Sequence, residues 1–152
     1  DVVSDVVAGL VNAAREKGVS LELRVEEETP LVRFGKAAAR LCTANLADNA
    51  VRYSPPGSKI FVRVGSQPDG RVRLEVADQG PGLPDHEVTR VFDKFFRGEQ
   101  AQRGGQGSGL GLYIVKALVD SLGGTVSLET RVPDGSRFSL SFPAAERPAS
   151  GV

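Results

Sequence analysis

A glycine-rich segment that runs directly into an apolar helical pattern is the feature that most constrains this chain. Residues 107–112 read Gly-Ser-Gly-Leu-Gly-Leu, and the apolar residues that follow predict a helix that begins in a flexible loop. A helix start presents unpaired backbone N–H groups and a partial positive charge, so it can bind a phosphate. Glycine lets the backbone approach such an anion because it has no Cβ. Taken alone, the pattern fits a tight connection equally well.

A second candidate segment follows a predicted strand. Apolar and polar residues alternate over residues 72–77, so Asp78 is expected at a strand end. Its carboxylate can accept a hydrogen bond from an exocyclic amine, while Gly80 and Gly82 leave room for a flat ring. The segment can therefore accommodate a flat ring that carries an amine.

Two asparagines precede these segments in a predicted helix. Asn45 and Asn49 are four residues apart within residues 36–53, and Pro55 ends the helical pattern soon after. Residues at this spacing lie on one face of a helix, one turn apart. An amide oxygen is a neutral, hard ligand, so the pair can complete a Mg²⁺ shell whose other ligands are phosphate oxygens and water.

These three segments, in this order, resemble the ATP-binding catalytic domain of sensor histidine kinases, in the gyrase, Hsp90, histidine-kinase and MutL ATPase superfamily. Residues 45–55 are similar to the family's N box, residues 78–82 to its G1 box, residues 91–97 to its F box and residues 107–111 to its G2 box. Gly-Ser-Arg-Phe at residues 135–138 resembles the terminal Gly-Thr-x-Phe signature, with serine in the threonine position. Several ordered motifs are far more specific than any one of them.

Apolar periodicity predicts alternating helices and strands along the chain. We expect helices over residues 2–17, over 36–53 and after residue 110, and strands over 21–25, 31–34, 60–64, 72–77, 126–130 and 137–142. The expected fold is an α+β two-layer sandwich, a mixed sheet of about five strands with three main helices on one face. The resemblance implies that this is the Bergerat-type ATP-binding fold. We expect one catalytic and ATP-binding domain over residues 1–143 and a disordered tail over residues 144–152.

Composition agrees with one soluble domain of ordinary size. The 152 residues carry 19 basic and 19 acidic side chains, a balance that argues against a nucleic-acid-binding surface. No apolar run approaches the roughly 20 residues that a membrane-spanning helix needs. The single cysteine, Cys42, excludes an internal disulfide and is expected to be a small buried hydrophobe.

The resemblance implies roles for individual residues. Asn49 is expected to bind Mg²⁺, Asn45 to support the metal or its water, and Arg52 to reach a phosphate. Tyr53 is expected near the nucleotide, and Asp78 to set adenine specificity. The family usually has lysine in place of Arg52, a change that keeps the charge and alters the geometry. The residues expected to bind ATP are Asn49, Arg52, Tyr53, Asp78, Gly80, Gly82, Arg103, Gln106, Gly107, Gly109, Leu110 and Gly111.

The hydrophobic pattern stops between residues 97 and 107, which fits either a surface loop or a lid over the nucleotide. We favour the lid because the motifs on both flanks match the family. The resemblance places Arg103 among the catalytic residues with Asn45 and Asn49, and places Gln106 at the phosphates or the metal.

The residue at position 45 discriminates between two reaction types. In hydrolases of the superfamily, a glutamate four residues before the metal-binding asparagine activates water, whereas this chain has Asn45 there. An amide has no useful basicity and cannot act as a general base. Phosphoryl transfer relies mostly on positioning and charge neutralisation, so a kinase can work without that base. The sequence therefore favours a kinase over an ATPase.

The chain resembles the donor half of a kinase without its acceptor. Its only histidine, His86, lacks the family's phosphoacceptor context, a histidine followed by an acidic residue on a long dimerising helix. The resemblance implies a dimerisation and phosphoacceptor domain in the full-length protein as partner, and a response regulator after it. Phe92 is expected in the core, while Phe95 or Phe96 is expected to meet the phosphoacceptor domain.

The resemblance also implies a cytoplasmic domain whose parent is anchored in the bacterial inner membrane, and an isolated chain that is monomeric. Two other functions stay open. An anti-sigma-factor-type serine kinase shares this fold, although the F box and the residues after Asn49 favour the histidine-kinase branch. A non-catalytic ATP-binding sensor or scaffold is the other, and the intact set of site residues argues against it.

Overall fold

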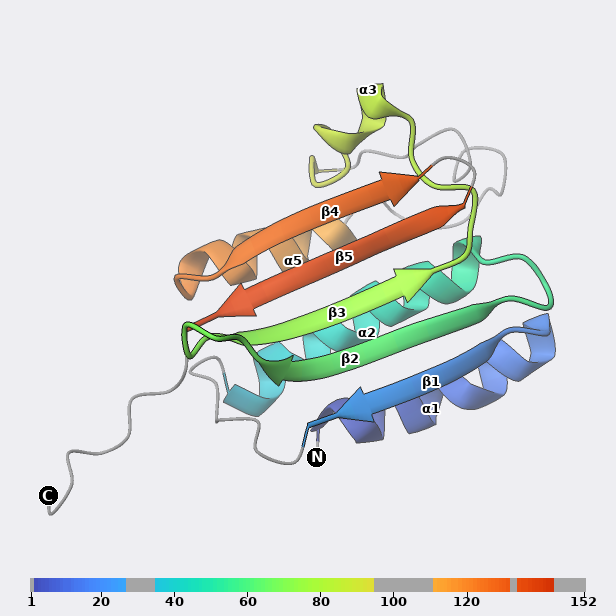
Figure 1. The fold of residues 1–152 in the computed structure, drawn as a ribbon, viewed down its shortest axis with the longest axis horizontal. Coiled ribbons are helices and arrows are strands. Elements are labelled where there is room, and N and C mark those ends of the chain that lie inside the picture. Colours follow the sequence, from blue (N-terminus) through green and yellow to red (C-terminus); the bar gives the residue numbers. More distant parts are fainter. Residues whose placement is uncertain (1, 27–34, 95–110, 132–133, 144–152) are drawn as a thin grey trace, which may run out of the picture.

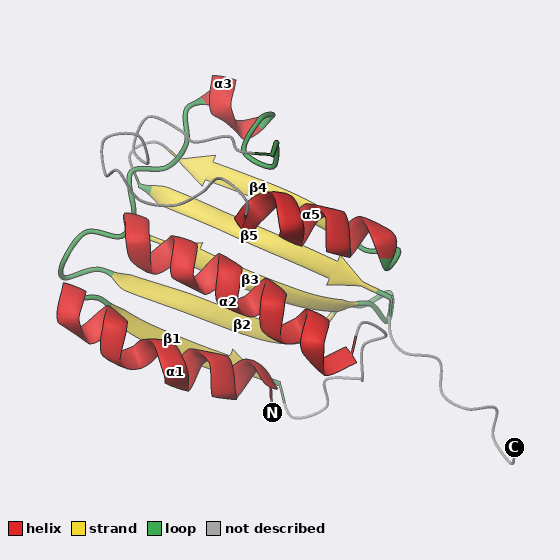
Figure 2. Ribbon diagram, turned by 180° about the vertical axis from the view of Figure 1, so that it is seen from behind, coloured by secondary structure: helices red, strands yellow, loops and turns green. Residues whose placement is uncertain are grey.

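The computed structural model describes residues 2–26, 35–94, 111–131 and 134–143. Figure 1 shows a twisted sheet, and Figure 2 shows the long helices lying side by side over one of its faces. The elements in chain order are α1 (Val2–Lys17), β1 (Ser20–Val25), α2 (Gly35–Tyr53), β2 (Lys59–Ser66), β3 (Val72–Asp78), α3 (Asp85–Val88), α5 (Gly111–Ser121), β4 (Thr125–Arg131) and β5 (Gly135–Phe142). The predicted α+β sandwich is confirmed.

The strands form a five-stranded mixed sheet in the order β1-β2-β3-β5-β4. β1 and β2 run parallel, and each of the other neighbouring pairs is antiparallel. A parallel pair needs a crossover connection, and α2 supplies it between β1 and β2. The connection carries α2 across the middle of the sheet, and α2 ends beside the end of β3 (Figure 1). Asp78 is the last residue of β3.

The hydrophobic core fills the space between the sheet and the helices. Alternate residues of β2 and β3 point toward the helices, and Val62 and Val76, which pair across the two strands, are each about 1% exposed. Leu46 of α2 and Val115 of α5 are fully buried against them. Burial of one such side chain contributes about 1.5–3 kcal/mol, so this layer fixes how α2 and α5 lie on the sheet.

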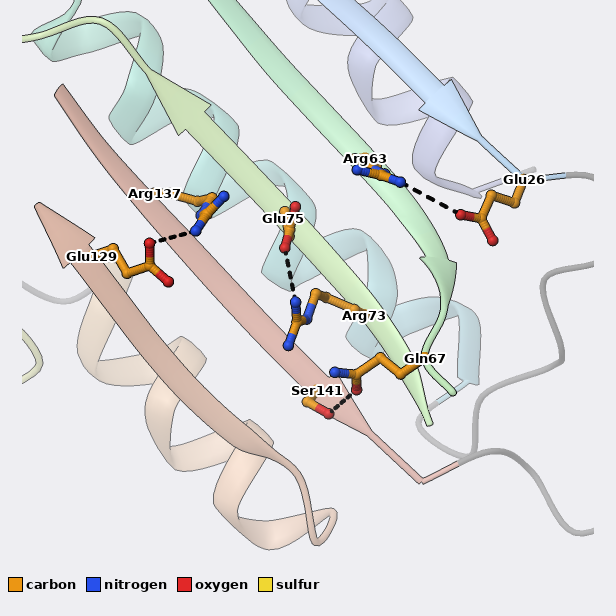
Figure 3. A network of polar contacts seen from close by, with 8 residues as sticks. All are labelled: Glu26, Arg63, Gln67, Arg73, Glu75, Glu129, Arg137 and Ser141. Carbon is orange, nitrogen blue, oxygen red and sulfur yellow. Dashed lines mark hydrogen bonds and ion pairs between the residues drawn. The ribbon is translucent and has the colours of Figure 1, made fainter. Parts of the chain in front are cut away.

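The opposite face of the sheet is polar and charged. Arg63 of β2 contacts Glu26 at 3.8 Å, and Arg73 contacts Glu75 on the same strand at 3.2 Å (Figure 3). A further ion pair joins β4 to β5, and the Ser141 hydroxyl lies 2.6 Å from the side-chain amide of Gln67. Exposed ion pairs contribute at most about 1 kcal/mol each. The exposed pair of Arg63 and Glu26 therefore adds little to stability, whereas the Glu75 side chain is only 15% exposed.

The element boundaries agree closely with those predicted. α1 and β3 lie where expected, α2 begins one residue early, and β4 and β5 are slightly longer than predicted. The strand predicted over residues 31–34 and the tail over 144–152 lie outside the described residues. Among the described helices, none has the length and apolar character that crossing a bilayer requires.

Candidate nucleotide-binding site

The two asparagines lie one turn apart on α2, and both are half-buried. The Asn45 Nδ2 donates a hydrogen bond to the backbone carbonyl of Leu41 at 2.9 Å, which orients the amide. Within the described part of the chain, no hydrogen bond reaches the side chain of Asn49. Its amide is therefore available to a ligand.

Gly111, the first residue of α5, lies directly against Asn45. A Cβ built on Gly111 would come within 2.9 Å of the Asn45 Oδ1, so any larger residue would displace the Asn45 amide. The contact joins the start of α5 to the asparagine face of α2. Gly111 was expected to bind nucleotide through its backbone; the structure adds a packing reason for glycine at this position.

Asp78 ends β3 and is held by two backbone amides. The N–H groups of Gly80 and Ser136 donate to the Asp78 Oδ1 at 2.9 and 3.3 Å. Burial raises the pKa of the Asp78 carboxyl above its ordinary value, and these two hydrogen bonds partly offset the effect. Among the described residues, nothing donates to the Oδ2, so this oxygen can accept from a ligand amine.

The loop after Asp78 is fixed at both sides by close backbone approaches. A Cβ on Gly80 would lie 2.8 Å from the backbone oxygen of Tyr53, at the end of α2. Gly82 has φ +76°, and a Cβ there would lie 2.9 Å from the Thr130 Oγ1. The same hydroxyl accepts a hydrogen bond from the Leu83 N–H at 2.7 Å. The two glycines thus seat the loop between α2 and β4.

Arg52 and Tyr53 occupy the last turn of α2. The Arg52 Nη2 lies 2.9 Å from the Asp48 Oδ2. The two residues are one helical turn apart and form an ion pair on the surface. Such an exposed pair contributes at most about 1 kcal/mol, so a phosphate can replace Asp48 at little cost. Tyr53 is half-buried beside Gly80.

Part of the predicted site lies outside the described residues. Arg103, Gln106, Gly107, Gly109 and Leu110 belong to this part, together with Phe95, Phe96 and the rest of the expected lid. Their assigned roles stay predictions. Of the F-box aromatics, Phe92 packs edge-on against Phe138 with ring centroids 6.0 Å apart, as expected for a core residue.

Sequence reasoning gave no role to three residues that shape the site. Ser136 and Gly135 belong to the recognised terminal signature, yet their contact with Asp78 was not predicted; a Cβ on Gly135 would lie 2.2 Å from the Asp78 carbonyl oxygen. Thr130 carries no sequence signal, because an alternating strand residue of this type is ordinary. Only the strand pairing brings Thr130 to the loop.

A metal at this site would have to take most of its ligands from the nucleotide. Within the described residues, no group of three or more His, Cys, Asp or Glu side chains could hold an ion. The amides of Asn45 and Asn49 supply neutral oxygens, which suit Mg²⁺ bound mainly to phosphate oxygens and water. The donor set therefore fits a metal that arrives with a phosphate ligand.

Comparison with known proteins matches this geometry to one family. The family described as histidine kinase-, DNA gyrase B-, and HSP90-like ATPase matches residues 36–146. The chain belongs to this family. The match covers α2, the end of β3, α5 and the closing hairpin, and so includes every described segment of the site.

Relatives of the chain are named as a signal-transduction kinase/phosphatase and as a sensor protein. The histidine-protein kinase/phosphatase MprB of Mycolicibacterium paratuberculosis is 37% identical over 97% of this chain, and the sensor protein DivL of Caulobacter vibrioides is 37% identical over 88%. These matches cover 29% of MprB and 16% of DivL. The chain thus spans less than a third of the length of the curated relatives it matches.

Solved structures show the same fold. A structure of the mycobacterial sensor histidine kinase MprB has a TM-score of 0.77 and 32% identity, and the match covers 95% of this chain and 97% of that one. Full-length ShkA in complex with AMPPNP has a TM-score of 0.84 and 28% identity over 97% of this chain and 30% of that one.

Proposed function

We propose that this chain binds Mg-ATP and donates the γ-phosphoryl group to a histidine on a separate dimerisation and phosphoacceptor domain. The observation that carries the proposal is the geometry of Asp78. Its Oδ1 is occupied by two backbone amides, and its Oδ2 has no donor among the described residues. A carboxylate fixed in this way can accept a hydrogen bond from the exocyclic amine of adenine.

The asparagine pair supports the phosphate end of the proposed complex. Asn49, with Asn45 one turn before it, would offer amide oxygens to Mg²⁺, which neutralises charge on the phosphates when it is bound. Arg52 would exchange its contact with Asp48 for a phosphate. From the part of the chain outside the described residues, we assign Arg103 and Gln106 to the phosphates or the metal, and Gly107, Gly109 and Leu110 to the phosphate loop.

The acceptor is proposed to be a histidine for two reasons. The site lacks a general base that could activate water, and the relative MprB is named as a histidine-protein kinase/phosphatase. Asn45 cannot activate water, and the chemical step needs only an aligned nucleophile. A histidine nitrogen would attack the γ-phosphorus, the bond from phosphorus to the β–γ bridging oxygen would break, and ADP would leave. In the proposed parent the domain is cytoplasmic, the parent is anchored in the inner membrane, and a response regulator receives the phosphoryl group. The isolated chain is proposed to be monomeric.

A phosphorylation assay tests this function. The proposed parent protein, with its dimerisation and phosphoacceptor domain, is incubated with γ-labelled Mg-ATP, and the protein-bound label is challenged with acid and with alkali. We expect acid to remove the label and alkali to leave it in place, because phosphohistidine is labile in acid and stable in alkali. Asn49→Ala should abolish the label, whereas Asn12→Ala, on an exposed position of α1, should leave it unchanged.

Other outcomes would contradict the proposal in distinct ways. An acid-stable label would indicate a serine kinase. ATP binding without any label would indicate a nucleotide sensor or scaffold. Normal labelling of the Asn49→Ala variant would disprove the assigned metal role.

A further inference from the structure

The last turn of α2 contains two carbonyl groups that the helix itself cannot satisfy. In an α-helix, a carbonyl oxygen accepts from the N–H four residues later. For Val51 and Arg52 these later residues are Pro55 and Pro56, and proline has no N–H. The sequence therefore leaves both oxygens without their helical donors, in the turn that carries Arg52 and Tyr53.

Lys17, the last residue of α1, supplies the missing donors. Its Nζ donates to the Val51 carbonyl oxygen at 2.6 Å and also to the carbonyl oxygen of Arg52. An ammonium group has three N–H donors, so one side chain can satisfy both oxygens. Its positive charge also lies at the negative end of the α2 dipole, where a cation is favourable.

Backbone contacts hold Lys17 in this position. The Gly57 N–H donates to the Gly18 carbonyl oxygen at 2.7 Å, and the Ser20 N–H donates to the Ser58 carbonyl oxygen at 3.1 Å. The turn after α1 and the turn after α2 are thereby joined on both sides of the lysine. Lys17 is half-buried between them, and burial, followed by the charge of Arg52, lowers the pKa of its ammonium group.

The end of α2 in turn contacts the loop that follows Asp78. Gly80 packs closely against the Tyr53 backbone oxygen, because a Cβ built on Gly80 would lie only 2.8 Å from it. The Gly80 N–H also donates a hydrogen bond to the Asp78 Oδ1. Fraying of the last turn of α2 would therefore displace Arg52, Tyr53 and the support of the loop together.

We propose that Lys17 is a positioning residue for the nucleotide site: it caps α2 in place of the amides that Pro55 and Pro56 lack, and so fixes Arg52 and Tyr53. The inference rests on the proposed function, because it concerns the affinity of that site for nucleotide. Lys17 makes no contact with the nucleotide in the proposed complex and acts only through the end of α2.

Three variants of this chain test the inference. Lys17→Met removes the ammonium group and keeps an apolar stem, and Lys17→Arg restores a cationic donor. Arg15→Met is the matched control, because Arg15 is an exposed cation two residues earlier on the same helix. Two quantities are measured well below each variant's melting temperature: amide exchange of Ser54, whose N–H donates to the Ala50 carbonyl oxygen at 3.0 Å, and the affinity for Mg-ADP.

Lys17→Met should speed the exchange of the Ser54 amide and weaken Mg-ADP binding by about three- to tenfold, because the net contribution of an ordinary hydrogen bond corresponds to a factor of this size. Lys17→Arg should restore both quantities, and Arg15→Met should change neither. Faster exchange with unchanged affinity would overturn the positioning role, and equal effects of Lys17→Met and Arg15→Met would show a general charge effect instead. A wild-type chain that binds no Mg-ADP would overturn the proposed function, while the exchange of Ser54 would still decide whether Lys17 caps α2.

Discussion

At the scale of single residues, Asp78 combines two opposing requirements. Recognition of an amine needs the ionised carboxylate, yet the half-buried position disfavours that charge and raises the pKa of the group. The hydrogen bonds from Gly80 and Ser136 recover part of this cost. The position proposed to bind the amine thus carries a cost in stability, as is common at functional sites.

This conflict predicts a pH-dependent stability difference. Because the folded state raises the pKa of Asp78, the group favours folding most when protonated, and that contribution is lost as the pH rises through the folded pKa. Asp78→Asn should therefore melt at a higher temperature than the wild type at neutral pH, since the amide oxygen can still accept from Gly80 and Ser136. The advantage should vanish in acid, where Asp78 itself is neutral.

The melting temperatures of both proteins are measured between about pH 3 and pH 8. This pH range spans the ordinary pKa of a carboxyl group. Asp134→Asn, at an exposed position, is the control and should show no such pH-dependent gain. A variant less stable than the wild type at neutral pH would mean that the hydrogen bonds to the carboxylate outweigh its burial.

At the scale of elements, the site depends on how closely β5 and the loop after β3 approach each other. Gly135 has φ +125°, and a Cβ there would lie 2.2 Å from the Asp78 carbonyl oxygen, which is backbone and cannot move aside. Gly70, in the β2–β3 turn, has φ +84° but nothing within 4 Å of its Cβ position. The two glycines separate the effect of backbone conformation from that of crowding.

Gly135→Ala should lower the free energy of unfolding by about 2 kcal/mol or more, because strain and a backbone clash act together. Gly70→Ala should cost about 1 kcal/mol, since only the left-handed backbone conformation is affected. Denaturant melts of the two variants measure the difference. Equal losses of unfolding free energy in the two variants would show that the backbone near Asp78 can move to accommodate the added Cβ at no cost in stability.

Most of the elements could be predicted from periodicity, and the reasons for the exceptions are physical. The stripe of apolar residues in α1 and the alternation in β3 each identify an element and its buried face, because burial follows local spacing. The paired asparagines and Asp78 could be proposed as site residues because their chemistry and their order along the chain are distinctive.

Contacts between distant segments could not be read from the sequence. Thr130 meets Leu83 only after β4 and β5 have paired, and Gly111 meets Asn45 only after α5 has packed beside α2. The role of Lys17 could have been suspected from Pro55 and Pro56, which remove two helical donors. Which residue replaces those donors is set by tertiary packing, and local spacing carries no information about it.

At the scale of the whole molecule, the rate at which the single thiol reacts with a reagent measures how often the core opens. Cys42 is fully buried on α2 beneath the sheet, and burial raises the pKa of its thiol to about 11. The raised pKa disfavours the thiolate, which is the reactive form, and burial also keeps a reagent away from the sulfur atom. An aromatic disulfide reagent at neutral pH should therefore modify Cys42 only through unfolding, at a rate that rises with denaturant in step with the unfolded fraction.

The rate of reaction of the fully denatured chain provides the control for the intrinsic reactivity of the thiol. Rapid modification of the native protein, with no dependence on low denaturant concentrations, would show that α2 opens locally without global unfolding. That result would contradict a core in which α2 is packed as one rigid layer with α1 and α5.

The most direct test of the account is a calorimetric titration with Mg-ATP and Mg-ITP. Inosine carries a carbonyl oxygen where adenine carries its exocyclic amine, and a hydrogen on the neighbouring N1, so Mg-ITP lacks the amine donor assigned to Asp78. The wild type should bind Mg-ATP at least about tenfold more tightly than Mg-ITP, because the wrong base leaves a half-buried carboxylate facing an acceptor. Asp78→Asn should lose this preference. Equal affinity of the wild type for both nucleotides, or the same preference in the variant, would contradict the assignment of Asp78 as the residue that recognises adenine.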